Sequence, residues 1–260
     1  MKKYLSFAVF SMLMAASVFA LASCGGDDDD DGDDPQEQAE ENGSDEDNND
    51  EDESKPKPLT PAGQAAVAVD LGLPSGTLWA DRNVGADKAE EPGDYFAWGE
   101  TAPKNRYNLD ISYKWFTEED RFTKYKGSDD DRYVLELKDD AANANWGGSW
   151  RMPTREELLE LLSYTNIQFV KDYNNTDIDG YKFISKSNPS KFIFLPVTGY
   201  KDGTSHIMPD YYGEYWTSSL STEHVSVADM LFFTRDDAPA KQWHNRVSGL
   251  SVRPVQQASE

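Results

Sequence analysis

Residues 146–162 read WGGSWRMPTREELLELL and contain the clearest helix signal in the chain. Thr154 and Glu157 have the spacing of a capping box, in which the threonine hydroxyl accepts from the Glu157 amide and the glutamate reaches back to the Thr154 amide. The leucines that follow at helical spacing predict an apolar stripe that packs into the core: Leu158, Leu159, Leu161 and Leu162. We therefore expect a helix that begins directly after Thr154.

Outside this stretch, short apolar runs bounded by turn residues indicate strands. Residues 67–71 alternate in polarity, and residues 77–80 follow a turn. Further apolar or strand-like runs are 95–98, 181–185, 192–195, 214–218, 230–234 and 249–255. Residues 100–140 are polar and aromatic together, and a loop that long is uncommon unless it packs or functions. The pattern predicts an α+β fold with short strands, one or two helices and long irregular loops.

The negative charge is concentrated near the N-terminus. The chain has a net charge of −23, and residues 24–54 hold 17 acidic and no basic side chains, which leaves −8 for residues 55–260. Residues 55–260, which we call the body, are acidic and have no basic stripe. This argues against nucleic acid as a partner.

Aromatic side chains have to supply much of the core. Cys24 is the only cysteine, so neither disulfides nor thiolate metal sites can hold the part of the chain that follows it. All seven tryptophans lie between residues 79 and 243. Four of them have apolar neighbours and are expected to be buried: Trp79, Trp98, Trp150 and Trp216.

The first 24 residues have the order of a secretory signal. Lys2 and Lys3 precede an apolar run over 5–21, and small residues follow. The end of this segment, Leu-Ala-Ser-Cys at 21–24, resembles the lipobox of bacterial lipoproteins. The resemblance implies that 1–23 is a signal peptide and that Cys24 carries the lipid, which makes the membrane a partner. The alternative is an uncleaved transmembrane anchor, for which the run is slightly shorter than the roughly 20 residues needed.

Residues 24–65 are predicted to be a lipidated cysteine followed by a disordered acidic tether. They hold almost no large apolar side chains, so they cannot bury enough surface to offset their conformational entropy. In many lipoproteins of the Gram-negative gut-bacterial type, such an acidic run looks like an export signal. It implies an outer-membrane location with the body facing the cell exterior, and the alternative is a spacer that faces the periplasm.

Six segments, taken in order, resemble the Fibrobacter succinogenes major paralogous domain: 76–86, 93–101, 146–154, 194–200, 215–219 and 249–255. That family is similar in turn to the C-type-lectin-like fold of formylglycine-generating enzymes. The resemblance implies a C-type-lectin-like domain over residues 66–256. It also implies that the two ends of the domain pair and that a long irregular insertion carries the binding surface.

The residues argue against catalysis. Formylglycine-generating enzymes depend on two active-site cysteines, and the body has none. The three histidines lack metalloprotease spacing, and Ser218 and Ser219 lack the glycines of a nucleophile elbow. We expect no enzyme activity and no cofactor. Calcium stays open, although the loop 91–93 departs from the Glu-Pro-Asn pattern of sugar-binding lectins and the aspartates at 129–131 are more typical of a solvated turn.

Sugar binding without calcium would use aromatic faces flanked by polar side chains. The candidate ligand-binding residues are Tyr200, Asp202, His206, Tyr211, Tyr212, Trp243, His244 and Asn245. Packing at the rim of the core is the alternative for each aromatic ring. The sequence thus favours a non-enzymatic binding module for a glycan or another extracellular polymer. The second hypothesis is a structural or assembly component of a surface complex or fimbria-like polymer, with proteins as partners.

Overall fold

The computed structural model describes residues 55–109, 112–119 and 121–258, which belong to one compact unit. The predicted signal peptide, Cys24 and the tether up to residue 54 lie outside the described residues. In the described part, no helix is long and apolar enough to cross a membrane.

The folded body begins earlier than residue 66. Thr60 caps the short helix α1 (Pro61–Ala65) and donates its backbone amide to the Trp146 carbonyl at 2.9 Å. The Lys57 carbonyl accepts from the Gly148 amide at 2.8 Å. The last part of the predicted tether therefore packs against the body.

The fold is α+β with antiparallel strand pairing throughout its named ladders, as the sequence predicts at this level. The other α-helices among the described residues are α2 (Ala141–Trp146) and α3 (Arg155–Tyr164), and the 3-10 turns are η1 (Leu137–Asp139) and η2 (Tyr173–Asn175). The strands are β1 (Ala68–Asp70), β2 (Thr77–Ala80), β3 (Phe116–Thr117), β4 (Arg121–Phe122), β5 (Thr165–Val170), β6 (Gly180–Ser185), β7 (Phe192–Pro196), β8 (Tyr200–Asp202), β9 (Ser205–Ile207), β10 (Tyr212–Leu220), β11 (Val227–Thr234), β12 (Ala240–Asn245) and β13 (Val255–Gln257).

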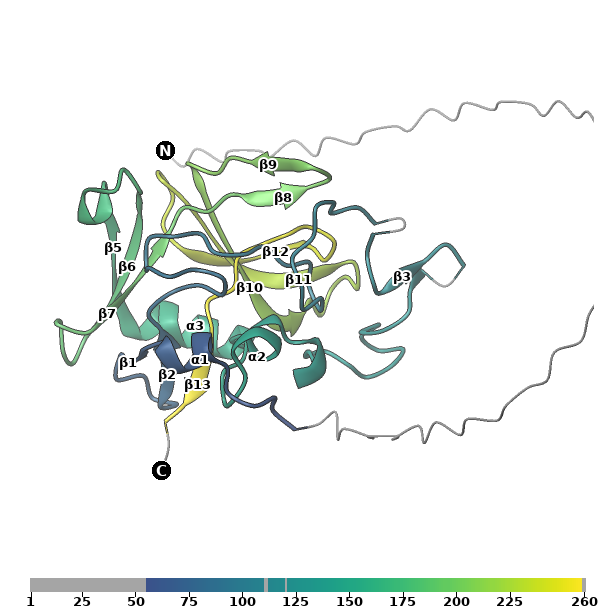
Figure 1. Ribbon diagram of the computed structural model, residues 1–260, viewed down its shortest axis with the longest axis horizontal. Helices are drawn as coiled ribbons and strands as arrows, with labels where there is room; N and C mark the ends of the chain where they lie inside the picture. Colours follow the sequence, from purple (N-terminus) through teal and green to yellow (C-terminus); the bar gives the residue numbers. More distant parts are fainter. Residues whose placement is uncertain (1–54, 110–111, 120, 259–260) are drawn as a thin grey trace, which may run out of the picture. The chain divides into compact units, whose positions relative to one another are not determined.

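The two ends of the body meet in one small sheet. Strand β2 lies between β1 and β13 (Figure 1). Trp79 is opposite both Val69 and Val255. The predicted strand at 249–255 is mostly wrong. Gly249, Leu250 and Ser251 each bridge to a different segment, so they build no common ladder, and the strand begins only at Val255.

Helix α3 begins as predicted. The Glu157 amide donates to Thr154 Oγ1 at 3.2 Å, and the Thr154 amide donates to the Glu157 carboxylate at 2.8 Å. Leu158 and Leu161 are buried and Leu162 is partly buried. The prediction for Leu159 is wrong: it is 44% exposed, because it lies on the solvent side of the helix with Glu156 and Ser163.

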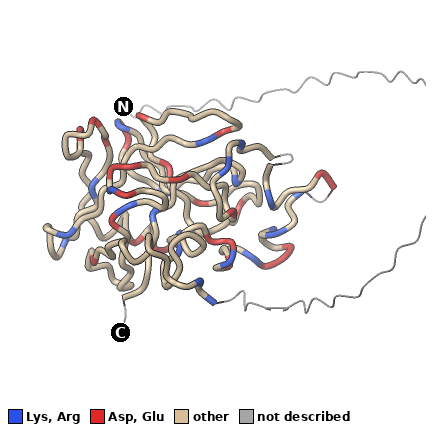
Figure 2. Tube along the Cα trace, viewed as in Figure 1, with Lys and Arg blue, Asp and Glu red and all other residues tan. Residues whose placement is uncertain are grey.

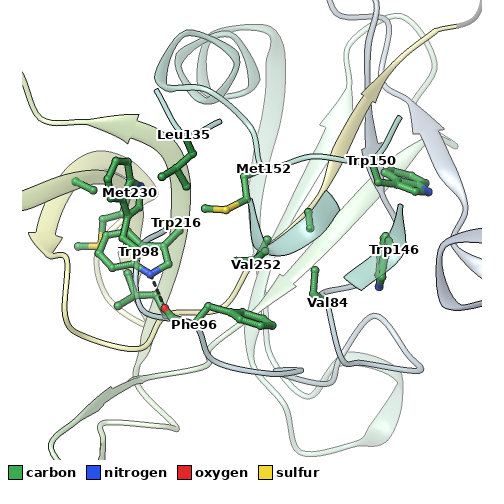
Figure 3. Close-up of a cluster of buried hydrophobic side chains, with 14 of the residues drawn as sticks. Val84, Phe96, Trp98, Leu135, Trp146, Trp150, Met152, Trp216, Met230 and Val252 are labelled. Carbon is green, nitrogen blue, oxygen red and sulfur yellow. Dashed lines mark hydrogen bonds between the residues drawn. The ribbon is translucent and has the colours of Figure 1, made fainter. Parts of the chain in front are cut away.

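The main core is rich in tryptophan, and the four predicted tryptophans are buried. Trp98 and Trp216 pack in one cluster with Trp150 and Met152 (Figure 3). The Trp216 indole donates to the Phe96 carbonyl at 2.8 Å, so this polar atom of the core is satisfied. A second cluster, which includes Trp79 and Leu158, joins α3 to the sheet β5-β6-β7.

The long segment 100–140 packs around a buried arginine. The Arg246 guanidinium donates to the backbone carbonyls of Lys124 and Tyr125 and to the Tyr113 hydroxyl, each at 3.0 Å. It also lies 4.7 Å from the ring centroid of Phe122. Burial lowers the pKa of Arg246. The carbonyl oxygens and aromatic faces replace water around this charge and hold the segment against the body.

Candidate functional site

The hairpin β8–β9 lies beside the sheet β10-β11-β12 (Figure 1). It brings a row of aromatic rings together. In the sheet register, Glu214 is opposite Phe232 and His244 is opposite Ala228. Side chains alternate along a strand, so Tyr212, Glu214, Phe232 and His244 share one face. Tyr200 of β8 reaches that face, since its ring centroid is 4.7 Å from that of His244.

We call the rings on this face the aromatic patch, and its members are Tyr200, Tyr211, Tyr212, Phe232 and His244. Tyr212 is the centre of the row: its ring centroid is 6.5 Å from Tyr200, 5.4 Å from Tyr211 and 5.5 Å from Phe232. All five residues are partly exposed. The patch therefore offers ring surface to the solvent while its inner edge packs on the core.

Polar groups flank the aromatic patch at its rim. Asp202, at the end of β8, is exposed. The Tyr211 hydroxyl donates to the Asp236 carboxylate at 2.8 Å, and that carboxylate raises the pKa of Tyr211. Carboxylate and hydroxyl groups beside half-exposed rings provide hydrogen-bond partners for a ligand that lies on the rings.

A buried carboxyl group lies beneath the patch. Glu214 is 2% exposed, and its Oε2 is 3.7 Å from His244 Nε2. Within the described residues, Glu214 Oε2 and His244 Nδ1 have no hydrogen-bond partner. Burial raises the pKa of Glu214 to about 8 and lowers the pKa of His244, which the charge of Asp202 partly opposes. Burial thus favours the uncharged form of both side chains.

His206 does not join the aromatic patch. Its Nε2 lies 2.9 Å from the Thr198 carbonyl and 3.0 Å from the Tyr95 hydroxyl, and its ring packs edge-on against Tyr95. Lys201, opposite His206 in the hairpin, places its Nζ 4.9 Å from the Tyr95 ring centroid. Both side chains fasten the hairpin to Tyr95.

Trp243 and Asn245 lie on the opposite face of β12 from His244. Trp243 is opposite Asp229 in the register and is 50% exposed. Asn245 lines a hollow of about 350 Å³ together with Phe116, Phe122 and Val247. The structure therefore brings together five of the eight predicted ligand residues, with Asp202 at the rim, and separates His206, Trp243 and Asn245 from them.

Sequence reasoning missed Glu214 and Phe232. Glu214 is the only ionisable carboxylate within residues 212–220, and it is two residues from both Tyr212 and Trp216. Strand alternation alone therefore places it on the same face as Tyr212. A lone carboxylate in an otherwise uncharged strand was the available signal. Phe232 offered none, because its position depends on the register with β10.

The other sites considered from sequence have structural partners. Asp130 accepts from the backbone amides of Lys126 and Arg132, so the aspartates at 129–131 form a turn. Ser218 donates to the Pro153 carbonyl, and Ser219 accepts from the Arg155 amide; both are buried. No group of three or more histidine, cysteine or acidic side chains that could hold a metal ion occurs in the part of the chain described.

Searches of protein-family models, of curated proteins and of solved structures find no match to this chain.

Proposed function

We propose that the protein is a lipid-anchored binding module at the cell surface, with a C-type-lectin-like body of the Fibrobacter major paralogous type. The module holds a glycan or another extracellular polymer on its aromatic patch and performs no catalysis. The observation that carries the proposal is the convergence of Tyr200, Tyr212 and His244 as partly exposed rings with Asp202 at their rim.

The chemistry of the patch suits a sugar. An aromatic face buries apolar surface against the C–H groups of a pyranose ring, while neighbouring polar groups bond its hydroxyls. Tyr200 and Tyr212 are stacked, with ring planes inclined by 17° and centroids 6.5 Å apart. Because no carboxylate cluster is required, binding is expected to be independent of calcium.

The architecture supports the fold assignment. The two ends of the body pair through β2 and β13, and the segment 100–140 is long, irregular and packed. The resemblance implies paired ends and a long irregular insertion. It also implies a binding surface on that insertion, whereas the proposed patch lies on β8, β10, β11 and β12. Basic residues are scattered over the body among acidic ones (Figure 2), which agrees with a neutral polymer as the ligand rather than an anionic one.

Binding of residues 55–260 to arrays of glycans, mucins and matrix proteins, with and without calcium, tests the proposal. The Tyr200→Ala and Tyr212→Ala variants should each weaken binding by about tenfold or more, which corresponds to about 1.4 kcal/mol. Tyr164→Ala is the matched control, because Tyr164 is 51% exposed at the end of α3 and away from the patch. Absence of binding under both conditions, or an equal loss in the control, would refute the proposal.

The anchor is tested separately in cells. Cys24 should incorporate labelled fatty acid, and Cys24→Ser should abolish the label and release the protein from membranes. Protease added to intact cells should degrade the body if it faces the exterior. Labelled protein that resists external protease would place the body in the periplasm.

A role as an assembly component is the second candidate. The observation in its favour is that β12 is the outermost strand of its sheet. The test is to isolate the chain from detergent-solubilised membranes with and without free sugar. A second protein that is recovered with it in stoichiometric amount, and that free sugar does not displace, would support this role over glycan binding.

A further inference from the structure

The outer edge of β12 is open to pairing with another strand. The sheet has the order β10-β11-β12, and no strand among the described residues pairs with the far side of β12. Gln242, Trp243 and Asn245 are exposed. An exposed strand edge presents unpaired backbone donors and acceptors.

The alternation of backbone hydrogen bonds along β12 shows which of its residues have amide and carbonyl groups that face outward. The Arg246 amide donates to the Ser226 carbonyl at 3.1 Å, which continues the ladder between β11 and β12. Because bonding alternates along an antiparallel strand, the even-numbered residues of β12 pair with β11. The backbone groups of Lys241, Trp243 and Asn245 then point away from the sheet, and of these the Asn245 carbonyl already accepts from the Ser248 amide at 3.1 Å.

Hydrogen bonds along β10, at the other edge of the same sheet, confirm this alternation. The Tyr212 carbonyl accepts from the Gly199 amide at 2.7 Å, and the Trp216 amide donates to the Ser251 carbonyl at 3.1 Å. Both even-numbered residues of β10 therefore bond away from β11. The odd-numbered residues of β10 and β11 pair with each other, and the even-numbered residues of β11 are left to pair with β12.

The usual devices that protect an edge strand are weak here. The strand reads AKQWHN, without proline or acidic residues. Its one lysine, Lys241, bonds the buried Asp229 carboxylate at 3.0 Å, and the same carboxylate also bonds Arg155 at 3.1 Å. Trp243 lies at the middle of the three outward-facing residues and is 50% exposed. Such an edge favours association over solubility.

We infer that β12 pairs antiparallel with β12 of a second copy of this chain, across a two-fold axis at Trp243. This register places Trp243 opposite Trp243 of the second copy and Lys241 opposite Asn245 of the second copy. The Trp243 amide of each copy then faces the Trp243 carbonyl of the other, and the Lys241 groups face those of Asn245, whose carbonyl also accepts from the Ser248 amide of its own chain at 3.1 Å. The register is self-complementary, as a two-fold interface requires.

The charges of the strand fit this register. Lys241 is opposite the uncharged Asn245 of the second copy, so the two lysines do not face each other. The two Trp243 indoles meet as a cross-strand aromatic pair. Gln242 is opposite His244 of the second copy, whose pKa burial lowers, so that pair is neutral at pH 7. The result is one continuous six-stranded sheet. Tyr200 and Tyr212 take no part in the pairing, whereas His244, which belongs to the aromatic patch, lies in the paired strand.

Sedimentation velocity of the full chain in detergent, at rising protein concentration and 0.15 M salt, tests this inference. The wild-type chain should show a reversible monomer–dimer equilibrium. Trp243→Asp should raise the dimer dissociation constant more than tenfold, because it places two carboxylates face to face on the axis. Val67→Asp is the control: Val67 is 57% exposed beside β1, which belongs to a different sheet from β12, and this variant should dimerise normally. A wild-type chain that remains monomeric, or equal losses in both variants, would overturn the inference.

Disulfide trapping tests the register independently of stability. Residues in a hydrogen-bonded antiparallel pair have Cα atoms about 5.5 Å apart, which a disulfide can bridge. Trp243→Cys in the full chain should give an oxidised dimer that reductant separates, whereas wild type and Tyr164→Cys should not. Dimers that form equally in all three chains would indicate crosslinking through Cys24 or random collision and would contradict this register.

Discussion

Glu214 is buried beneath the aromatic patch, and its Oε2 has no hydrogen-bond partner among the described residues. Burial raises its pKa from 4.5 to about 8. The folded chain therefore holds this proton more tightly than the unfolded chain does. As the pH rises from about 4.5 to about 8, the unfolded chain deprotonates first, and the free energy of unfolding falls.

Glu214→Gln should remove this fall in the free energy of unfolding with rising pH. We expect the variant to exceed wild type by about 1–3 kcal/mol in free energy of unfolding at pH 8.5 and to match it at pH 4, where both side chains are neutral. Urea unfolding at the two pH values measures the difference. Glu223→Gln, at an exposed glutamate between β10 and β11, should leave the pH dependence unchanged. A variant that is less stable than wild type at pH 8.5 would contradict the assignment.

Helix α3 shows how far a local pattern determines the structure of an element. The capping box specified its first residue, and the leucine spacing predicted a buried stripe that holds for Leu158 and Leu161 but not for Leu159. The sequence did not distinguish Leu158 from Leu159, since adjacent leucines differ by about 100° around the helix axis and only the packing partners decide which one faces inward.

The adjacent leucines make a matched pair for mutation. Leu158→Ala should lower the free energy of unfolding by about 2–5 kcal/mol, because it opens a cavity in the cluster that joins α3 to the sheets. Leu159→Ala should change it by less than about 0.5 kcal/mol, since that side chain is largely in solvent. Thermal or urea unfolding of the two variants checks this, and similar losses in both would show that α3 is rotated from the orientation described.

At the scale of the whole molecule, Arg246 joins the segment 100–140 to the sheet that carries the patch. Its guanidinium is completely buried and bonds the backbone carbonyls of Lys124, Tyr125 and Val225. No carboxylate pairs with it in the described hydrogen bonds and ion pairs. Removal of the guanidinium leaves these carbonyls buried without a donor, which costs far more than a surface ion pair.

Arg246→Met should therefore destabilise the body by about 3–5 kcal/mol and should increase amide hydrogen exchange first in residues 112–140. Hydrogen-exchange mass spectrometry locates the change. Arg132→Met removes an arginine whose side chain is about half exposed, and it should have little effect. Exchange that rises uniformly over the body would show that Arg246 stabilises the whole fold rather than this segment.

The eight candidate ligand residues show the limit of sequence reasoning at the site. The sequence identified Tyr200, Tyr212 and His244 as available aromatic groups, and they do meet. It also grouped Trp243 with His244 because they are adjacent, but adjacent residues of a strand point to opposite faces. Strand β12 was not predicted, so this alternation could not be applied.

The sequence by itself determined the features that depend on a few neighbouring residues: the start of α3, strands such as β2 and β6, and the burial of the four predicted tryptophans. Only the tertiary structure decided which of these segments meet. Trp216 bonds the Phe96 carbonyl across 120 residues of chain, and the position of Glu214 beneath the patch depends on the register of three strands. Local side-chain spacing encodes helices and strands, whereas strand register and packing between distant segments arise from the fit of the whole core.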